Sequence, residues 1–242
     1  MTIFLLTLFP QEVHQFFLKG IFKRGSEKGL FDFRVIDIRG FADNSSNRVD
    51  HYPFGGKKGM LLRADILAKA IKSIDQYESY RIIYTCPKGN LLTQPMAESL
   101  AAEKSLIIIC GYYEGIDERL FEMFSIERVS IARAVLSSGE VPALAIAEAT
   151  LRLIPGVVGK QASIEDDSLL TGLLEYPQYT VPRTIDELNV PDILVSGHHG
   201  DIDRWRRKES LKTTLFLKPE LLHEFVPDSK DQTYFAQILQ ED

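Results

Sequence analysis

Residues 105–119 of this 242-residue chain read SLIIICGYYEGIDER. A short apolar run, residues 106–110, is followed at once by Gly111 and then by a polar turn that ends at Gly115. Uninterrupted apolar runs of this length are typical of strands that are buried on both faces of a parallel sheet. Parallel sheets bind ligands in the turns at the carboxyl ends of their strands. This stretch therefore predicts a buried strand that leads into a candidate ligand-binding turn.

Similar runs recur on both sides of this stretch and alternate with amphipathic segments. The strand-like runs are residues 3–9, 31–38, 81–86, 105–110 and 127–132. The helix-like segments are residues 11–19, 63–77, 93–103, 117–124 and 141–153. Strands that alternate with helices favour an α/β domain with a mainly parallel sheet.

The pattern changes after Gly156, which indicates a second part of the chain. Residues 159–174 have little apolar periodicity and many Ser, Glu and Asp residues, so we expect a flexible connector that carries acidic side chains. Three prolines and several helical segments follow. The sequence thus predicts an α/β domain over residues 1–158 and a small, mainly helical domain over residues 175–242.

Residues 40–62 form the longest stretch of the first domain without strand or helix signals. Gly55, Gly56 and Gly59 cluster within it. A loop of this length inside a compact domain is usually functional.

Composition and charge exclude several classes of protein. Hydrophobic residues at 45% and charged residues at 26% match an ordinary globular protein and argue against disorder. The net charge of −6 argues against a surface coated in nucleic acid, although a local basic patch stays compatible with it. No apolar stretch approaches the roughly 20 residues that span a bilayer, so we expect no membrane association.

The amino-terminal residues and the two cysteines indicate a reduced, cytoplasmic protein. The opening residues MTIFLLTLFPQEV lack a basic segment and a cleavage site, which favours a buried first strand over a signal peptide. Cys86 and Cys110 each end an apolar run, and no CxxC motif or Cys/His cluster is present. Such cysteines are more often inert core thiols than a disulfide or a metal site. We expect no metal ligands among the side chains of this chain.

Two common nucleotide-binding motifs are absent, but three glycine-bearing turns follow predicted strands. No GxGxxG follows the first strand, and the Gly55–Gly59 segment lacks the Lys-Ser/Thr ending of a P-loop. The three turns are residues 86–89, 110–115 and 136–140. One such turn is usually structural, whereas three together favour a ligand site at the carboxyl edge of the sheet.

The order of these segments and the residues in them resemble the TrmD family, the bacterial tRNA (guanine-N1)-methyltransferases. The strings that carry the resemblance are LFP at 8–10, VD at 49–50, PFGG at 53–56, GML at 59–61, CG at 110–111, YEGIDER at 113–119, VLS at 135–137, GE at 139–140, PA at 142–143, Arg152, IPGV at 154–157, DS at 167–168, SGH at 196–198 and RWR at 204–206. The match extends from the first strand to about residue 219.

The resemblance implies a fold and a reaction that periodicity does not indicate. It implies a deep trefoil knot in the amino-terminal domain, a rare exception to unknotted chain connectivity. It also implies a homodimer with shared active sites, and methyl transfer from S-adenosylmethionine to N1 of the guanosine at tRNA position 37, 3′ of the anticodon. A loosely bound Mg²⁺ is implied as well. The implied cofactor-binding residues are Thr85, Cys86, Pro87, Gly89, Gly111, Glu114, Ile131, Ala132, Ala134, Leu136, Ser138, Gly139 and Pro142.

The chemistry of the reaction explains the two implied catalytic residues. Guanine N1 carries a proton at neutral pH, so a base must remove it as the methyl group arrives. Asp167 matches the family's proposed base. The charge that develops on O6 needs a nearby donor or cation, for which Arg152 matches. Without the resemblance, a solvated loop carboxylate and a surface helix charge would be the simpler interpretations.

The predicted helix of residues 201–212 is basic and contains the single tryptophan of the chain, Trp205. Clustered guanidinium and ammonium groups suit phosphate contacts. A solvated helix face with Trp205 in the core is the alternative. The residues that we expect to contact tRNA are Asp50, Ser163, His198, Arg204, Arg206, Arg207 and Lys208.

The sequence departs from the family pattern mostly near the expected cofactor loops. The usual GGGPGM reads GGKKGM at residues 55–60, and Tyr112 replaces an arginine. The segment usually close to IGDYVLSGGE reads IARAVLSSGE at residues 131–140. Two alternatives stay open: an RNA-binding homologue without catalysis, and a knotted methyltransferase of another RNA. The presence of Arg152, Asp167 and Glu114 together argues against the first.

Overall fold

The computed structural model describes residues 1–43, 46–56, 58–158, 172–223 and 225–241. The chain divides into two compact units, Met1–Gly159 and Lys160–Asp242. Each has a hydrophobic core of its own.

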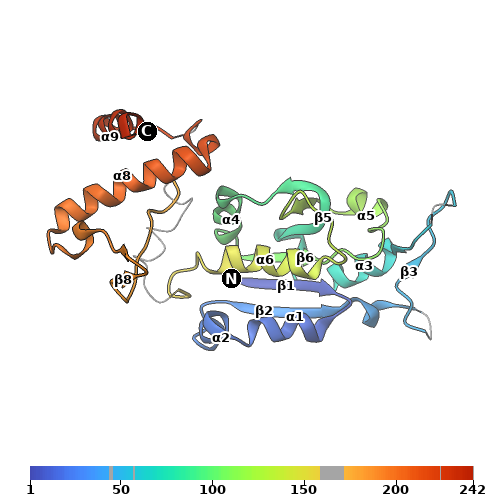
Figure 1. Ribbon diagram of the computed structural model, residues 1–242. Coiled ribbons are helices and arrows are strands. Elements are labelled where there is room, and N and C mark those ends of the chain that lie inside the picture. Colours follow the sequence, from blue (N-terminus) through green and yellow to red (C-terminus); the bar gives the residue numbers. More distant parts are fainter. Residues whose placement is uncertain (44–45, 57, 159–171, 224, 242) are drawn as a thin grey trace. The chain divides into compact units, whose positions relative to one another are not determined.

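The first unit is built around a five-stranded sheet (Figure 1). Its strands are β1 (Thr2–Thr7), β2 (Asp32–Asp37), β5 (Arg81–Leu91), β6 (Ser105–Ile109) and β7 (Ile126–Ser130). They lie in the order β2-β1-β6-β5-β7, and every pair is parallel. All five residues of β6 are buried. This confirms the predicted α/β class and the mainly parallel sheet.

Helices cover both faces of the sheet because successive strand residues point to opposite sides. Phe4, Leu6 and Ile107 face one core, which α3 (Ala64–Lys72) and α5 (Arg119–Met123) complete. Ile3, Leu5 and Ile108 face the other core. The helices on that second side are α1 (Pro10–Phe17), α4 (Gln94–Ala101) and α6 (Glu140–Leu151).

Some elements of this unit are not predicted by the sequence pattern. Helix α2 (Gly20–Glu27) contains two glycines, which disfavour helix, but Gly25 lets the helix pack closely on Phe31. A short helical turn, Ile38–Phe41, leads into the loop of residues 40–62. The loop contains the two-residue strands β3 (Asp50–His51) and β4 (Leu61–Leu62), which pair antiparallel.

Strand β5 runs further than predicted, to Leu91, and is interrupted in its middle. Thr85 and Asn90 both pair with Val129 of β7, so the intervening residues are pushed out of the ladder. Gly89 makes this possible: a Cβ atom there would lie 2.4 Å from the backbone of Arg128 and Val129. The bulge projects residues 86–88 from the carboxyl end of the strand's first half.

The second unit is mainly helical in its described part. After the hairpin of β8 (Thr184–Ile185) and β9 (Leu188–Asn189) come the short turn Asp192–Val195, α8 (His199–Leu217), the turn Pro219–His223 and α9 (Ser229–Glu241). Leu173, Leu211 and Ile238 form its fully buried core. No helix among the described residues is long and apolar enough to cross a membrane.

Candidate active site

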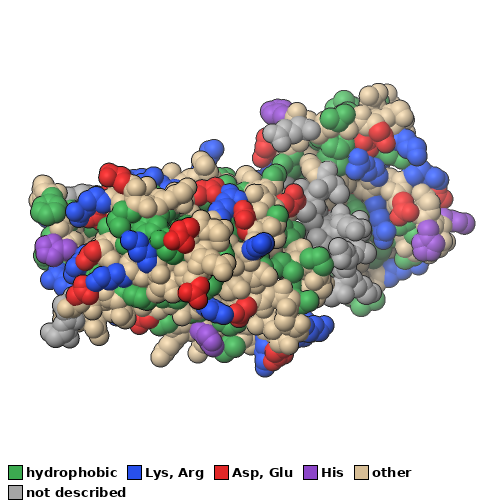
Figure 2. Space-filling model, turned by 180° about the vertical axis from the view of Figure 1, so that it is seen from behind, with side chains coloured by type: hydrophobic (Ala, Val, Ile, Leu, Met, Phe, Trp, Pro, Cys, Tyr) green, Lys and Arg blue, Asp and Glu red, His purple; other side chains and the backbone are tan. Residues whose placement is uncertain are grey.

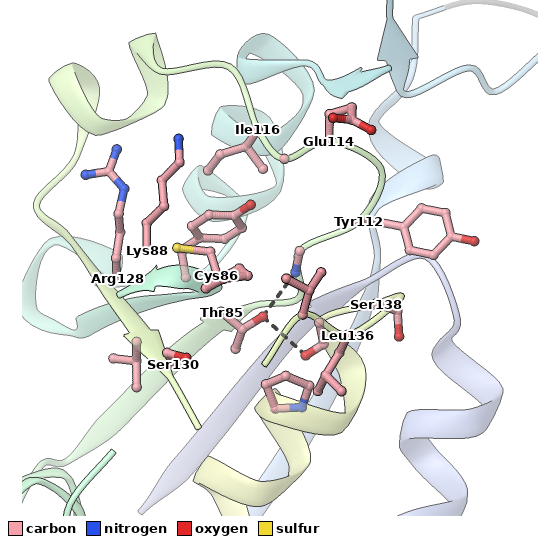
Figure 3. Close-up of a pocket in the computed structure, with 18 of the residues that line it drawn as sticks. Thr85, Cys86, Lys88, Tyr112, Glu114, Ile116, Arg128, Ser130, Leu136 and Ser138 are labelled. Atoms are coloured by element: carbon pink, nitrogen blue, oxygen red, sulfur yellow. Dashed lines mark hydrogen bonds between the residues drawn. The ribbon is translucent and has the colours of Figure 1, made fainter. Parts of the chain in front are cut away.

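A cavity of about 310 Å³ lies at the carboxyl ends of β5, β6 and β7 (Figure 3). Its walls come from the β5 bulge, the turn after β6, and the segment that joins β7 to α6. The volume falls within the roughly 300–1,000 Å³ typical of small-molecule sites. The three glycine-bearing turns therefore meet at one cavity, because the strands that they follow end at the same edge of the parallel sheet.

Thr85 joins the three walls at the floor of the cavity. Its buried hydroxyl accepts a hydrogen bond from the Gly111 amide (3.1 Å) and lies 3.2 Å from the Gly139 carbonyl, to which it can donate (Figure 3). The Gly139 amide donates to the Gly111 carbonyl at 2.6 Å. These hydrogen bonds between buried groups hold the three segments together.

The glycines at this crossing are required by close approach. A Cβ atom on Gly139 would lie 2.1 Å from the Gly111 nitrogen and 2.4 Å from the Thr85 hydroxyl. A Cβ atom on Gly111 would lie 2.6 Å from the Thr85 carbonyl oxygen. Any larger side chain would push the walls apart.

The glycine-rich loop of residues 55–60 is tied to the upper wall of the cavity. The Glu114 amide donates to the Met60 carbonyl (3.0 Å), and the Leu62 amide donates to the Gly115 carbonyl (2.9 Å). Gly59 has a φ of +98° and lies so close to the Glu114 side chain that a Cβ atom would collide with it. Tyr113 has a φ of +56°, an uncommon conformation for a residue other than glycine that is often found at binding sites.

Burial changes the acidity of several groups in and beneath the cavity. Burial, with Cys86 nearby, raises the pKa of the Tyr84 phenol, so Tyr84 is neutral at any physiological pH. Partial burial and the charge of Asp50 raise the pKa of Tyr113. Burial and the nearby Glu140 raise the pKa of the Cys110 thiol well above its ordinary value, which fits an inert core thiol. Cys86, which we expected in the core, is only half-buried and lines the cavity.

Most of the expected cofactor-binding residues lie around this one cavity. Those that line it are Thr85, Cys86, Pro87, Gly111, Glu114, Ile131, Ala134, Leu136, Ser138, Gly139 and Pro142. Gly89 and Ala132 do not line it. Gly89 instead permits the bulge that carries Cys86 and Pro87.

Some lining residues escape the sequence reasoning. Lys88, Glu118 and Arg128 contribute charged groups to the wall, and Phe121 contributes a ring. Lys88 lies between Pro87 and Gly89, which are both expected to bind the cofactor, so its place in the wall could have been predicted from the sequence. Arg128 and Glu118 belong to β7 and to the start of α5, and only the folded chain brings them together.

The altered glycine positions do not strain the backbone. Ala132 and Ser138 stand where the family usually has glycine, and neither has a positive φ. Their conformations are open to any residue. The segment of residues 131–140 therefore keeps its path beside Gly111 and Thr85 despite the changes.

The structure places one of the two expected catalytic residues, Arg152, away from the cavity of its own chain. Arg152 caps the carboxyl end of α6, whereas the cavity lies at its amino end, at Gly139. The twelve residues of α6 separate Gly139 from Arg152 by roughly 20 Å. Asp167 and Ser163 lie outside the described residues, so their placement rests on the sequence alone.

The expected RNA-binding arginines of α8 are all paired with carboxylates. Arg204 pairs with Asp201, and Arg206 pairs with Asp203 at 3.5 Å. Arg207 makes two 2.8 Å hydrogen bonds to Asp231, which is almost fully buried.

The remaining expected RNA contacts are spread over both units. Trp205, the alternative core residue, is half-buried, and its ring lies 6.4 Å from that of Tyr179. His198 is the N-cap residue of α8 and is exposed, and its side chain makes no capping hydrogen bond. Lys208 lies on the same helix, and Asp50 pairs with Arg48 in β3 of the first unit. In the described part of the chain, no three His, Cys, Asp or Glu residues lie close enough to hold a metal ion.

The fold and the cavity define an α/β protein with a cavity of small-molecule size at the carboxyl edge of a parallel sheet. A family model described as tRNA (Guanine-1)-methyltransferase TrmD matches residues 1–224, and the chain belongs to this family. This confirms the resemblance read from the sequence.

Curated relatives match over nearly the whole chain. A protein of Geobacillus kaustophilus is 43% identical over 238 residues, covering 98% of each chain. One of Bacillus licheniformis is 42% identical over 239 residues, covering 98% of each. One of Staphylococcus epidermidis is 41% identical over 227 residues, covering 94% of this chain and 93% of the relative. All three are named tRNA (guanine-N(1)-)-methyltransferase.

Proposed function

We propose that this protein transfers a methyl group from S-adenosylmethionine to N1 of the guanosine at position 37 of tRNA. The observation that carries the proposal is the cavity itself. Three turns, of which residues 85–88, 111–115 and 134–139 line it, converge on the cavity although they are far apart in sequence, and the second and third contain family strings. Membership of the family supplies the reaction and the substrate.

The residues that line the cavity fit S-adenosylmethionine. Leu136, Ile131 and Pro142 give an apolar surface for an adenine ring, and the loops offer backbone groups for its polar edges. Charged side chains, among them Lys88 and Glu114, lie elsewhere on the wall and suit the amino-acid end of the molecule. When bound, the cofactor supplies a methyl group that is already electrophilic because it is attached to a sulfonium.

The chain's own residues must then make guanine N1 nucleophilic. Asp167 is the proposed base for the N1 proton, and Arg152 the proposed partner of the charge that spreads onto O6. Because Arg152 lies at the opposite end of α6 from its own cavity, we propose that it serves the cavity of a second copy. A homodimer with shared active sites follows from this arrangement.

The knot belongs to the same proposal. The segment of residues 130–139 passes against residues 85 and 111 at the close crossing held by Gly139. A chain that threads there would hold the cofactor loops rigidly. A requirement for Mg²⁺ is part of the proposal too, and chelation by EDTA during the assay tests it.

Methyl transfer to tRNA tests the proposed function directly. Purified protein, S-adenosylmethionine and tRNA with a guanosine at position 37 should give N1-methylguanosine at that position. Binding of the cofactor without transfer to this tRNA would indicate another RNA substrate, and the absence of cofactor binding would contradict the proposal.

The role of Asp167 is tested by Asp167→Asn. The amide keeps the size of the side chain but cannot accept the N1 proton. We expect cofactor binding to persist while the single-turnover rate with saturating tRNA falls by about a hundredfold or more. A near-normal single-turnover rate would remove Asp167 from this role.

A further inference from the structure

The wall of the cavity has two chemically different regions. Around Thr85, Leu136 and Gly139 it is apolar or formed by backbone groups. Elsewhere it is charged, with Lys88 and Arg128 extending side by side from β5 and β7 (Figure 3). A ligand that fills the cavity must therefore carry both an apolar ring system and a charged group.

The two cations differ in how they are held. The Arg128 guanidinium is hydrogen-bonded to Glu118 and lies 3.4 Å from the centre of the Phe121 ring, so its position is fixed and part of its charge is offset. Lys88 is exposed on the bulge of β5, and the structure gives it no ion-pair partner among the described residues. Lys88 is thus the cation of this wall that is available to a ligand.

We propose that Lys88 binds the α-carboxylate of S-adenosylmethionine, while the neighbouring Arg128 stays paired with Glu118. The carboxylate is the only anionic group of that molecule, since its sulfonium and ammonium are both positive. The inference rests on the proposed function. It goes beyond that function by assigning the group that holds the amino-acid end of the cofactor.

The geometry of the bulge explains why Lys88 can do this. The register shift between Thr85 and Asn90 lifts residue 88 out of the ladder, so its side chain leaves the sheet beside Arg128 instead of packing on a face. The neighbouring Glu118 compensates Arg128 and leaves Lys88 as the ion-pairing group. A charge-assisted hydrogen bond of this kind contributes modestly at an exposed site, so we expect about a tenfold effect on affinity.

The test compares two ligands that share the adenosine and the sulfur but differ in the amino-acid end, which contains the carboxylate. S-adenosylhomocysteine carries the amino-acid end, and 5′-methylthioadenosine lacks it. Titration calorimetry of the full-length protein should show that Lys88→Met weakens S-adenosylhomocysteine by about tenfold and leaves methylthioadenosine unchanged. Lys88→Arg, which keeps the charge, should restore most of the difference.

Lys104→Met is the matched control, because Lys104 is an exposed lysine just before β6, at the opposite edge of the sheet. It should change neither affinity. Equal weakening of both ligands by Lys88→Met would indicate a distorted loop and would overturn the inference. If Lys88→Met left both ligand affinities unchanged but weakened tRNA binding, the inference would also be overturned, because Lys88 would then contact a phosphate of the tRNA. A wild-type protein that binds neither ligand would overturn the proposed function first.

Discussion

Gly139 is held between the backbone of Gly111 and the Thr85 hydroxyl, with no space for a Cβ atom. We expect Gly139→Ala to destabilise the protein by about 1–3 kcal/mol, as overpacking of a filled site does, and to weaken S-adenosylhomocysteine binding by at least about tenfold. Thermal unfolding and calorimetry measure the two effects. Gly40→Ala is the control, because nothing lies within 4 Å of a Cβ atom there. Normal ligand affinity in Gly139→Ala would show that the crossing does not shape the cavity.

Asp231 is the buried partner of Arg207 in the second unit. It also accepts a hydrogen bond from the Asp228 amide. Asp231→Asn leaves Arg207 without its counter-charge, so we expect a loss of about 2–3 kcal/mol of unfolding free energy in this unit. Trp205 is the only tryptophan and lies in α8, so its fluorescence during urea unfolding follows this unit alone. Asp203→Asn, whose carboxylate is exposed, should have almost no effect.

The same pair predicts an acid dependence. The hydrogen bonds from Arg207 hold the pKa of Asp231 below its ordinary value, so the folded unit binds the carboxylate's proton less tightly than the unfolded chain does. Its contribution to stability is complete above the unfolded pKa of about 3.9 and is lost as pH falls through the lower folded pKa. Trp205 fluorescence should show that the wild type's advantage over Asp231→Asn shrinks below about pH 4. A constant difference down to pH 2 would contradict this.

At the scale of elements, α8 carries most of the basic residues that we expect to bind tRNA. Arg207 is hydrogen-bonded to Asp231, so the exposed arginines Arg204 and Arg206 are the better candidates for tRNA contacts. Figure 2 shows that basic and acidic side chains are intermixed on the face that it draws. Arg204→Ala with Arg206→Ala should weaken tRNA binding by about three- to thirtyfold and flatten its dependence on salt, since fewer counterions are released.

The measurement for α8 is tRNA affinity over a salt series. Lys230→Ala removes one exposed positive charge from α9 and serves as the control. Affinity for S-adenosylhomocysteine should not change, because the cavity is formed by the first unit. Equal affinities and slopes for the double variant and the wild type would make α8 a solvated face and would place the tRNA contacts elsewhere.

At the scale of the whole molecule, the long distance between Arg152 and its own cavity predicts how subunits complement one another. Both Arg152 and Asp167 should act from one copy on the cavity of the other. A mixture of Gly139→Ala and Asp167→Asn chains then contains mixed dimers with one complete active site. In that site the Asp167→Asn chain supplies the intact cavity, and the Gly139→Ala chain supplies the intact Arg152 and Asp167. With S-adenosylmethionine kept too low to fill the Gly139→Ala cavity, about a quarter of the wild-type activity should return after random exchange.

A mixture of Asp167→Asn and Arg152→Ala chains is the matched control for this experiment. If both residues act from the same copy, every active site in that mixture lacks one of them, and activity stays absent. Recovery in this second mixture would place the two residues in different subunits of one site. Sedimentation of each variant checks that the dimer itself is retained.

The sequence by itself determined the strands and the type of sheet. Hydrophobic runs such as residues 105–110 depend only on neighbouring residues, so the strands and most helices of the first unit are readable to within a few positions. The turns that line the cavity were readable too, because glycines after strands mark them. The reaction could be inferred from the family strings, because each string matches the family's pattern at particular residues.

Only the tertiary structure decided how these pieces meet. The strand order β2-β1-β6-β5-β7 brings Thr85, Gly111 and Gly139 into contact across gaps of up to 54 residues, and no local pattern encodes such an order. The same packing places Lys88 beside Arg128 and pairs Arg207 with the buried Asp231. It also places Arg152 at the opposite end of α6 from the cavity. The physical reason is that these contacts depend on which buried surfaces fit together, a property of the whole fold and of no single segment.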